Sequence, residues 1–219
     1  SRNNYRLYNA LQGDISHAPE RFRILFQPIV DATGNTRKVE ALSRWHNPEF
    51  PDVPADVFFG LAERYRLIQE LGRLILGQTL RELVLLRQQL GEPDLGLAIN
   101  ISPSQLSLEG FGPLLLAQLS EHRIAAESVT VEITESAVIE TSFELTDNLN
   151  SLRRAGVKLA LDDFGTGYSS LRLLMWLKPD ELKIDKTFVV AASQDPVALQ
   201  IVHLLQSLTE QMQLVLVAE

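Results

Sequence analysis

One stretch of the sequence indicates the fold most clearly, namely Val157-Lys158-Leu159-Ala160-Leu161-Asp162-Asp163. It is a short apolar run that ends in two adjacent acids, as expected of a buried strand with polar residues at its carboxyl end. Similar runs recur along the chain. We expect seven strands, at Phe22–Val30, Val39–Trp45, Leu95–Ile101, Val129–Thr134, Val157–Leu161, Glu181–Ile184 and Leu214–Val217.

The stretches between these runs have the apolar periodicity of helices. The clearest helices are expected at Ala55–Arg66, Ile68–Gln89, Pro113–His122, Phe143–Ala155, Tyr168–Leu177 and Pro196–Met212. Strands that alternate with helices predict a parallel sheet covered by helices, which is either a doubly wound sheet or a (β/α)8 barrel. The segment Asn47–Pro54 holds three prolines and is expected to be a long loop.

Polar residues at the strand ends distinguish between the two folds. They lie in or at the C-terminal ends of different apolar runs: Glu40, Asn100, Glu132, Asp162 with Asp163, Lys183 and Glu219. Only a barrel points so many strand ends at one place, and barrel enzymes keep their active sites on that face. Neither a Gly-x-Gly-x-x-Gly fingerprint nor a Walker-type phosphate loop occurs. The sequence therefore predicts an α/β protein with a TIM-type (β/α)8 barrel.

Composition narrows the possible functions. The chain has 219 residues, with 20 Lys and Arg against 28 Asp and Glu, and its formal net charge is −8. This acidity argues against a polybasic nucleic-acid binder, so we expect no DNA partner. The absence of cysteine excludes disulfides, thiolate metal sites and cysteine nucleophiles, and it is compatible with the cytoplasm, where we expect the domain.

Strand alternation indicates which polar side chains share a face, because residues two apart in a strand point to the same side. By this rule Glu40, Leu42 and Arg44 share a face, and Asn100, Asp162 and Lys183 point into the barrel. Carboxylates with an amide oxygen form a hard-oxygen site that suits Mg²⁺ or Mn²⁺. Two such ions are a common device for hydrolysing a phosphodiester. A lysine beside them would orient water, and Arg44 would hold a phosphate.

Together the motifs resemble those of the EAL-domain cyclic di-GMP phosphodiesterases. Glu40-Ala41-Leu42 is similar to the signature that names the family. The other motifs occur in the family's order: Phe26-Gln27-Pro28-Ile29-Val30, Asn100-Ile101-Ser102, Glu132-Ile133-Thr134-Glu135, Asp162-Asp163-Phe164-Gly165-Thr166-Gly167-Tyr168-Ser169-Ser170-Leu171, Leu182-Lys183-Ile184-Asp185 and Val217-Ala218-Glu219. The resemblance covers the chain from about Phe22 to its last residue.

The resemblance implies hydrolysis of cyclic di-GMP to linear pGpG with two Mg²⁺ or Mn²⁺ ions. It implies that Glu40, Asn100, Glu132 and Asp162 hold one ion, and that Asp162, Asp163 and Glu219 hold the other. Lys183 would act with Asp162 and Glu219 in catalysis, and the substrate would contact Gln27, Leu42 and Arg44. Glu135 would anchor the loop Asp163–Ser170, through which we expect a homodimer.

The ends of the chain suggest a fragment of a longer protein. The sequence stops at Glu219, where the family continues, so we expect the eighth βα unit to be absent from this sequence and the barrel domain, residues 21–219, to be C-terminally incomplete. Residues 1–20 are expected to form a helical linker from an upstream sensory or cyclase-like domain.

Other interpretations stay open. A single acid such as Asp163 can cap a following helix, Asp185 suits a salt bridge as well as a site, and Gln27 suits a core amide. For the whole domain, the alternative function is a catalytically silent receptor that binds cyclic di-GMP. A barrel phosphohydrolase with another substrate would explain the metal site but not the order of the motifs.

Overall fold

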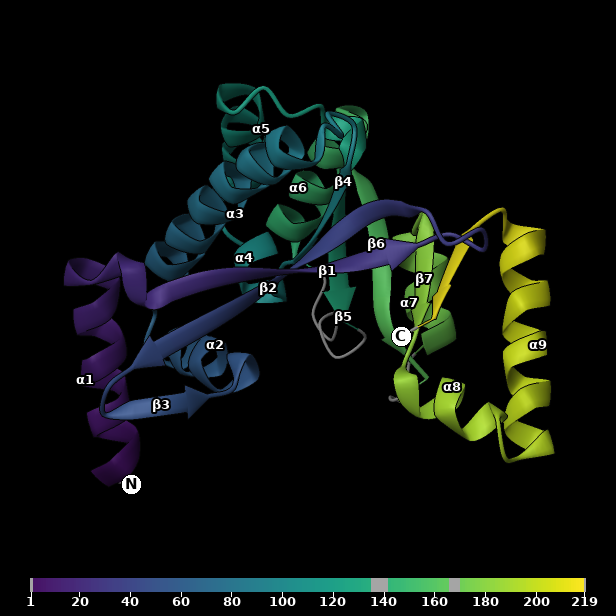
Figure 1. Cartoon of the computed structure of the whole chain (residues 1–219), viewed down its shortest axis with the longest axis horizontal. Helices are drawn as coiled ribbons and strands as arrows, with labels where there is room; N and C mark the ends of the chain where they lie inside the picture. Colours follow the sequence, from purple (N-terminus) through teal and green to yellow (C-terminus); the bar gives the residue numbers. More distant parts are fainter. Residues whose placement is uncertain (1, 135–141, 166–169, 219) are drawn as a thin grey trace. The chain divides into compact units, whose positions relative to one another are not determined.

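The computed structural model describes residues 2–134, 142–165 and 170–218 (Figure 1). The chain divides into two compact units. The first consists of Ser1–Ile99 with Pro113–Ser128, and the second of Asn100–Gly112 with Val129–Glu219.

The first unit is built on a long hairpin. Strand β1 (Phe22–Val30) pairs antiparallel with β2 (Thr36–Asn47), and β2 pairs parallel with β4 (Gly96–Asn100). The expectation of an all-parallel sheet is therefore wrong for the first strand. The connection, residues 31–35, is too short for the crossover that parallel neighbours require, so the chain turns straight back.

A further strand, β3 (Phe50–Val53), pairs antiparallel with β2. It lies inside Asn47–Pro54, so the expectation of a long loop there is wrong for residues 50–53. Pro51 lies within β3, which has β2 as its partner in the sheet. Proline is tolerated in an edge strand of this kind, because its missing N–H need not serve a second neighbour.

The helices of this unit are α1 (Arg2–His17), η1 (Pro19–Arg21), α2 (Ala55–Arg64), α3 (Ile68–Leu90), the greater part of α5 (Phe111–Glu121) and η2 (Ala126–Ser128). Helices α1, α2 and α3 form a core with the hairpin. The core gathers Phe22, Trp45 and Phe58, with Leu11 of α1 fully buried among them. Part of the expected N-terminal linker segment thus packs into the first unit.

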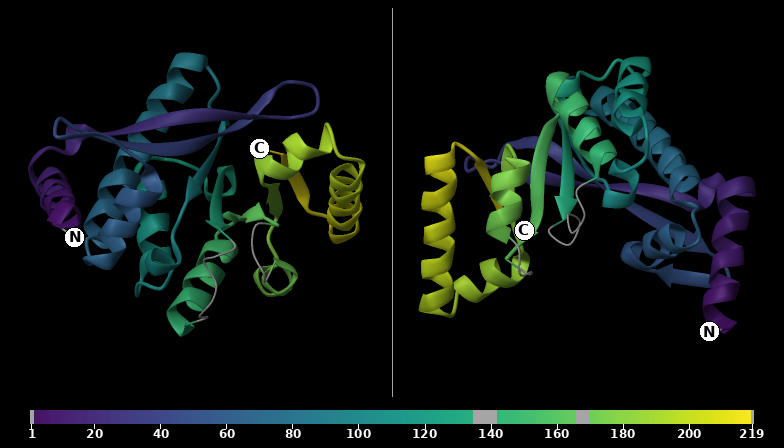
Figure 2. Two further views of the ribbon diagram at one scale, coloured as in Figure 1. Left: turned by 90° about the horizontal axis from the view of Figure 1, so that it is seen from below. Right: turned by 180° about the vertical axis from the view of Figure 1, so that it is seen from behind.

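The described part of the second unit has four parallel strands: β5 (Val129–Thr134), β6 (Lys158–Phe164), β7 (Glu181–Ile184) and β8 (Val215–Ala218). Its helices are α4 (Pro103–Leu106), α6 (Phe143–Arg154), α7 (Ser170–Leu177), α8 (Lys186–Ala192) and α9 (Pro196–Met212). Helix α9 lies beside β8 in Figure 1 and in both views of Figure 2. The βα alternation expected from the sequence is confirmed in this unit.

The helix predictions differ from the structure mainly at the ends. The expected helix Pro196–Met212 matches α9 residue for residue, and Asp195 caps it by accepting a hydrogen bond from the Val197 amide at 2.8 Å. The short helices α4 and α8 were missed because four and seven residues carry too little periodicity. Within the described residues, no helix has both the length and the apolar character needed to cross a membrane.

Candidate active site

Three charged side chains meet near the carboxyl ends of neighbouring strands in the second unit. Lys183 of β7 places its Nζ 3.0 Å from Oε2 of Glu132 on β5 and 3.2 Å from Oδ1 of Asp162 on β6. The side chains of Lys183, Glu132 and Asp162 are 1%, 0% and 9% exposed. The strand register brings Glu132 close to Asp162, because Thr134, two residues after Glu132, pairs with Asp162.

Burial makes these contacts energetically significant. A charge removed from water is strongly disfavoured unless a partner of opposite sign and hydrogen bonds replace the solvent. Lys183 serves both carboxylates, and the formal charge of the three groups is 1 − 2 = −1. A buried cluster with excess negative charge attracts further positive charge.

Asp163 leaves the strand geometry that its neighbours follow. Its φ of 55° lies in the left-handed region, which is uncommon for residues other than glycine, although aspartate is among those enriched there. Its backbone N–H donates to Oδ1 of Asp162 at 2.9 Å. Strand alternation would turn Asp163 away from Asp162, and the left-handed backbone at Asp163 interrupts that alternation where the register between β6 and β7 also shifts.

The segment that follows Asn100 is held against β5. The Ile101 amide donates to the Glu132 carbonyl at 3.1 Å, which brings the backbone next to Asn100 alongside the strand that carries Glu132. Ser102 begins α4 with a capping box, in which its hydroxyl and the Gln105 side chain each accept from the other's backbone amide. Ser102 therefore has a structural role in helix initiation.

The remaining predicted residues lie in the first unit. Gln27 and Glu40 are direct partners in the β1–β2 register, Leu25 opposes Leu42, and Arg44 is exposed. Positions 40, 42 and 44 share one face of β2 by the strand alternation, while Ala41 and Trp45 on the other face are buried. Arg44 donates from Nη1 to the carbonyl of Ser43 at 2.9 Å.

The structure thus brings Lys183 into contact with Glu132 and Asp162. Asp163 follows Asp162 in the chain, and the segment after Asn100 is hydrogen-bonded to the strand that carries Glu132. Glu40, Gln27, Leu42 and Arg44 lie on the β1–β2 hairpin of the first unit. Glu135, Glu219 and residues 166–169 of the expected dimer loop lie outside the described residues.

The donor set fits a hard divalent cation in its chemistry. Glu132, Asp162 and Asp163 offer carboxylate oxygens and Asn100 an amide oxygen, which are ligands that Mg²⁺ and Mn²⁺ prefer. In the part of the chain that the structure describes, no three acidic or histidine side chains converge closely enough to form a metal site by themselves.

Asp185 has a role that the sequence interpretation did not anticipate. Its carboxylate accepts hydrogen bonds from the hydroxyl and, at 2.9 Å, from the amide of Thr187, and so caps α8. The Thr187 hydroxyl is the main cause that lowers the pKa of this carboxyl below its ordinary value. The Asp-x-Thr spacing ahead of a short helix was the signal that would have revealed the cap.

The chain is similar to proteins of one known family. The family model described as "EAL domain" matches residues 8–219. The chain is 34% identical over 202 residues to the cyclic di-GMP phosphodiesterase RocR of Pseudomonas aeruginosa, covering 90% of this chain and 50% of that protein. The chain spans between 22% and 50% of the length of the curated relatives it matches.

Solved structures show the same fold. The EAL enzyme Bd1971 in its cAMP-bound form aligns with a TM-score of 0.88 and 28% identity, over 99% of this chain and 60% of that one. The PaMucR phosphodiesterase in complex with c-di-GMP aligns with a TM-score of 0.82 and 32% identity, over 95% and 85%. These matches confirm the α/β fold of TIM-barrel type, and with the family match they establish that the chain belongs to the EAL domain family.

Proposed function

We propose that this chain is a metal-dependent phosphodiesterase domain that hydrolyses cyclic di-GMP to linear pGpG in bacterial second-messenger signalling. The observation that carries the proposal is the buried contact of Lys183 with Glu132 and Asp162, which combines excess negative charge with a proton-bearing group. The names of RocR and of the PaMucR complex support the choice of substrate.

Two Mg²⁺ or Mn²⁺ ions are part of the proposal. Glu40, Asn100, Glu132 and Asp162 would hold one, and Asp162, Asp163 and Glu219 the other. When bound, the ions supply an activated water and neutralise charge on the phosphodiester. Asp162 is common to both sets, so its buried carboxylate is the ligand whose loss would affect both ions.

The chain's own groups would divide the remaining work. Lys183 carries three N–H donors and already contacts two of the proposed ligands, so its ammonium is suited to orient the attacking water and to stabilise the developing negative charge. Arg44 has a planar fork of donors that matches a phosphate. Gln27 and Leu42 lie on the hairpin with it and would contact the nucleotide.

We also propose how the domain assembles, what precedes it in the whole protein and where in the cell it works. Glu135 would anchor the loop Asp163–Ser170 and a homodimer would form through that region. Residues 1–20 would connect the barrel domain at residues 21–219 to an upstream domain. The nucleotide substrate implies that the domain works in the cytoplasm.

The test is a chromatographic assay of cyclic di-GMP with Mg²⁺, Mn²⁺ or EDTA, using the chain, Asp162→Asn and the control Asp147→Asn. Asp147 is an exposed acid on α6, so its substitution makes the same chemical change away from the cluster. We expect metal-dependent pGpG from the chain and the control, and a loss of about 100-fold or more in Asp162→Asn.

Two outcomes would contradict the proposal. Metal-dependent hydrolysis at the unchanged rate in Asp162→Asn would reject the assigned centre. A chain that binds cyclic di-GMP with both metals present and never releases pGpG would be the silent receptor.

A further inference from the structure

The turn Asp163–Gly165, at the carboxyl end of β6, departs twice from ordinary backbone geometry. Asp163 has a φ of 55° and Gly165 a φ of 104°, so two residues within three lie at positive φ. For a residue other than glycine, the left-handed conformation costs on the order of 1 kcal/mol. Such a conformation persists only where surrounding contacts hold it, so the neighbours of this turn are of interest.

The side chain of Phe188 lies against this turn. A Cβ atom added to Gly165 would stand 2.7 Å from Cε2 of Phe188, which is closer than real Cβ contacts, and 3.0 Å from Cζ, which is at the tight end of their range. The edge of the ring therefore occupies the space in which any other residue at position 165 would carry its side chain. The φ angle favours glycine at this position, and the Phe188 ring would have to shift to admit any larger residue.

Phe188 lies in the first turn of a capped helix. Phe188 belongs to α8, which Asp185 caps through Thr187, and the Phe188 amide donates to the Asp185 carbonyl at 3.1 Å. Strand β7 leads directly into this cap, and its Ile184 pairs with Phe164 of β6. Phe164 and Ile184 are 4% and 1% exposed. The turn is thus fixed on one side by strand pairing and on the other by an aromatic ring.

We propose that Phe188 is a positioning residue for Asp163. Its ring confines Gly165, two residues along the chain, and thereby keeps Asp163 in the left-handed conformation that interrupts the strand alternation. The consequence for function rests on the proposed function, in which Asp163 holds a divalent cation. Loss of the ring should release the turn, and Asp163 should then be free to adopt the right-handed conformation that most residues prefer.

The test compares Phe188→Ala and Phe188→Leu with Val190→Ala in the full chain. Val190 lies on the same helix and is 63% exposed, so its substitution controls for a smaller side chain on α8 without touching the turn. Binding of Mn²⁺ is followed by electron paramagnetic resonance titration, and amide hydrogen exchange is followed over residues 162–165.

We expect Phe188→Ala to weaken binding of one Mn²⁺ by about 10-fold or more, in the range seen when outer partners of metal ligands are removed. Amide exchange should rise in the turn, and kcat should fall while the KM for cyclic di-GMP is retained. Phe188→Leu, which keeps part of the apolar bulk, should fall between the parent chain and Phe188→Ala. Val190→Ala should match the parent.

Equal Mn²⁺ affinity and equal exchange in Phe188→Ala and Val190→Ala would overturn the inference, even if the chain hydrolyses cyclic di-GMP. The same holds for Phe188→Leu if Phe188→Ala fails to fold. A chain that does not hydrolyse the nucleotide, but whose Mn²⁺ affinity depends on Phe188, would uphold the inference and reject the proposed function. A chain that binds no Mn²⁺ would overturn both.

Discussion

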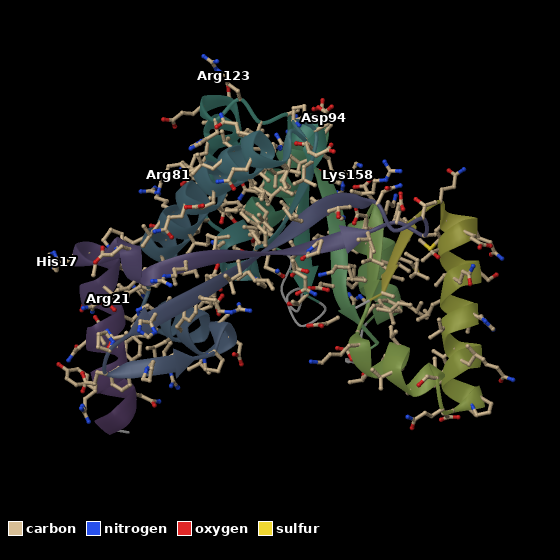
Figure 3. All side chains as sticks on the ribbon, in the orientation of Figure 1. His17, Arg21, Arg81, Asp94, Arg123 and Lys158 are labelled. Carbon is tan, nitrogen blue, oxygen red and sulfur yellow. The ribbon has the colours of Figure 1, made fainter. Side chains whose placement is uncertain are left out.

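Both units bury carboxylates, and they compensate the charge differently. In the first unit, Asp14 of α1 is 4% exposed and accepts hydrogen bonds from Trp45 Nε1 at 2.9 Å, Asn47 Nδ2 at 2.7 Å and Arg21 Nη1 at 2.5 Å. Arg21 is labelled in Figure 3 beside the end of α1. In the second unit, Glu132 and Asp162 contact the same Lys183.

This difference separates a structural acid from a candidate catalytic pair. One carboxylate with one guanidinium and two neutral donors is a balanced group that fastens α1 to β2. The three groups Glu132, Asp162 and Lys183 carry a formal charge of −1 among themselves, which suits a cation. Burial alone therefore does not mark a functional acid; the balance of charge among its contacts is the better guide.

The largest expected effect is that of Lys183→Met, which removes the ammonium that both carboxylates contact. The variant should lose about 3–5 kcal/mol of stability without metal, because buried carboxylates then lack that charge partner. Added Mn²⁺ should recover more stability in the variant than in the parent chain, since a ligand stabilises the state that binds it. Urea unfolding with and without Mn²⁺ measures both quantities.

Lys158→Met is the matched control for this change. Lys158 is the first residue of β6, is exposed, and is labelled in Figure 3. It should leave stability and the Mn²⁺ effect unchanged. If Mn²⁺ raised the stability of Lys183→Met and of the parent by the same amount, the proposed difference between the structural acid Asp14 and the acids around Lys183 would be wrong.

A smaller effect is expected for Asp14→Ala. The substitution leaves the donors of Trp45 and Asn47 buried without their acceptor, and it should reduce stability by about 2–3 kcal/mol. Because the Asp14 group is balanced by Arg21, Mn²⁺ should not restore the loss. The comparison is with Asp94→Ala, an exposed acid labelled in Figure 3, which should unfold like the parent. Recovery of Asp14→Ala by Mn²⁺ would argue that this carboxylate also belongs to a cation site.

The smallest effect is expected for Asp31→Asn in the β1–β2 turn. The Thr33 hydroxyl, and next the Arg37 guanidinium, lower the pKa of the Asp31 carboxyl below its ordinary value of 3.8. A lowered folded pKa contributes stability above the unfolded value of about 4, and this contribution is lost as the pH falls through the folded pKa. Thermal melts should therefore show a small deficit for Asp31→Asn at pH 7 that shrinks toward pH 2. A deficit that grows in acid would contradict this sign.

Much of the second unit was predictable from the sequence, for identifiable physical reasons. Apolar runs with polar ends indicate parallel strands. Strand alternation predicts that Asp162 and Lys183 point to the same side of the sheet, and in the structure these two side chains are in contact. Pro196 after Asp195 indicated where α9 begins. These features depend on local periodicity and on capping chemistry, which a single sequence carries directly.

Other features depend on contacts between distant segments. Nothing near Asp163 indicates its left-handed φ, because aspartate adopts ordinary conformations as well. The contact of Phe188 with Gly165 and the burial of Asp14 against Trp45 arise only when separate elements pack. The antiparallel direction of β1 was misjudged because strand periodicity carries no information on direction, although the short connection to β2 was a usable signal.

The most direct measurement counts the Mn²⁺ ions bound by the chain, by Asp162→Asn and by Asp14→Asn, with electron paramagnetic resonance. Both substitutions replace one buried carboxylate by an amide of the same shape. We predict that Asp162→Asn loses bound Mn²⁺ and that Asp14→Asn binds as many ions as the parent. Retention of all bound Mn²⁺ in Asp162→Asn would contradict the claim that the acids around Lys183 form the metal centre of this EAL domain.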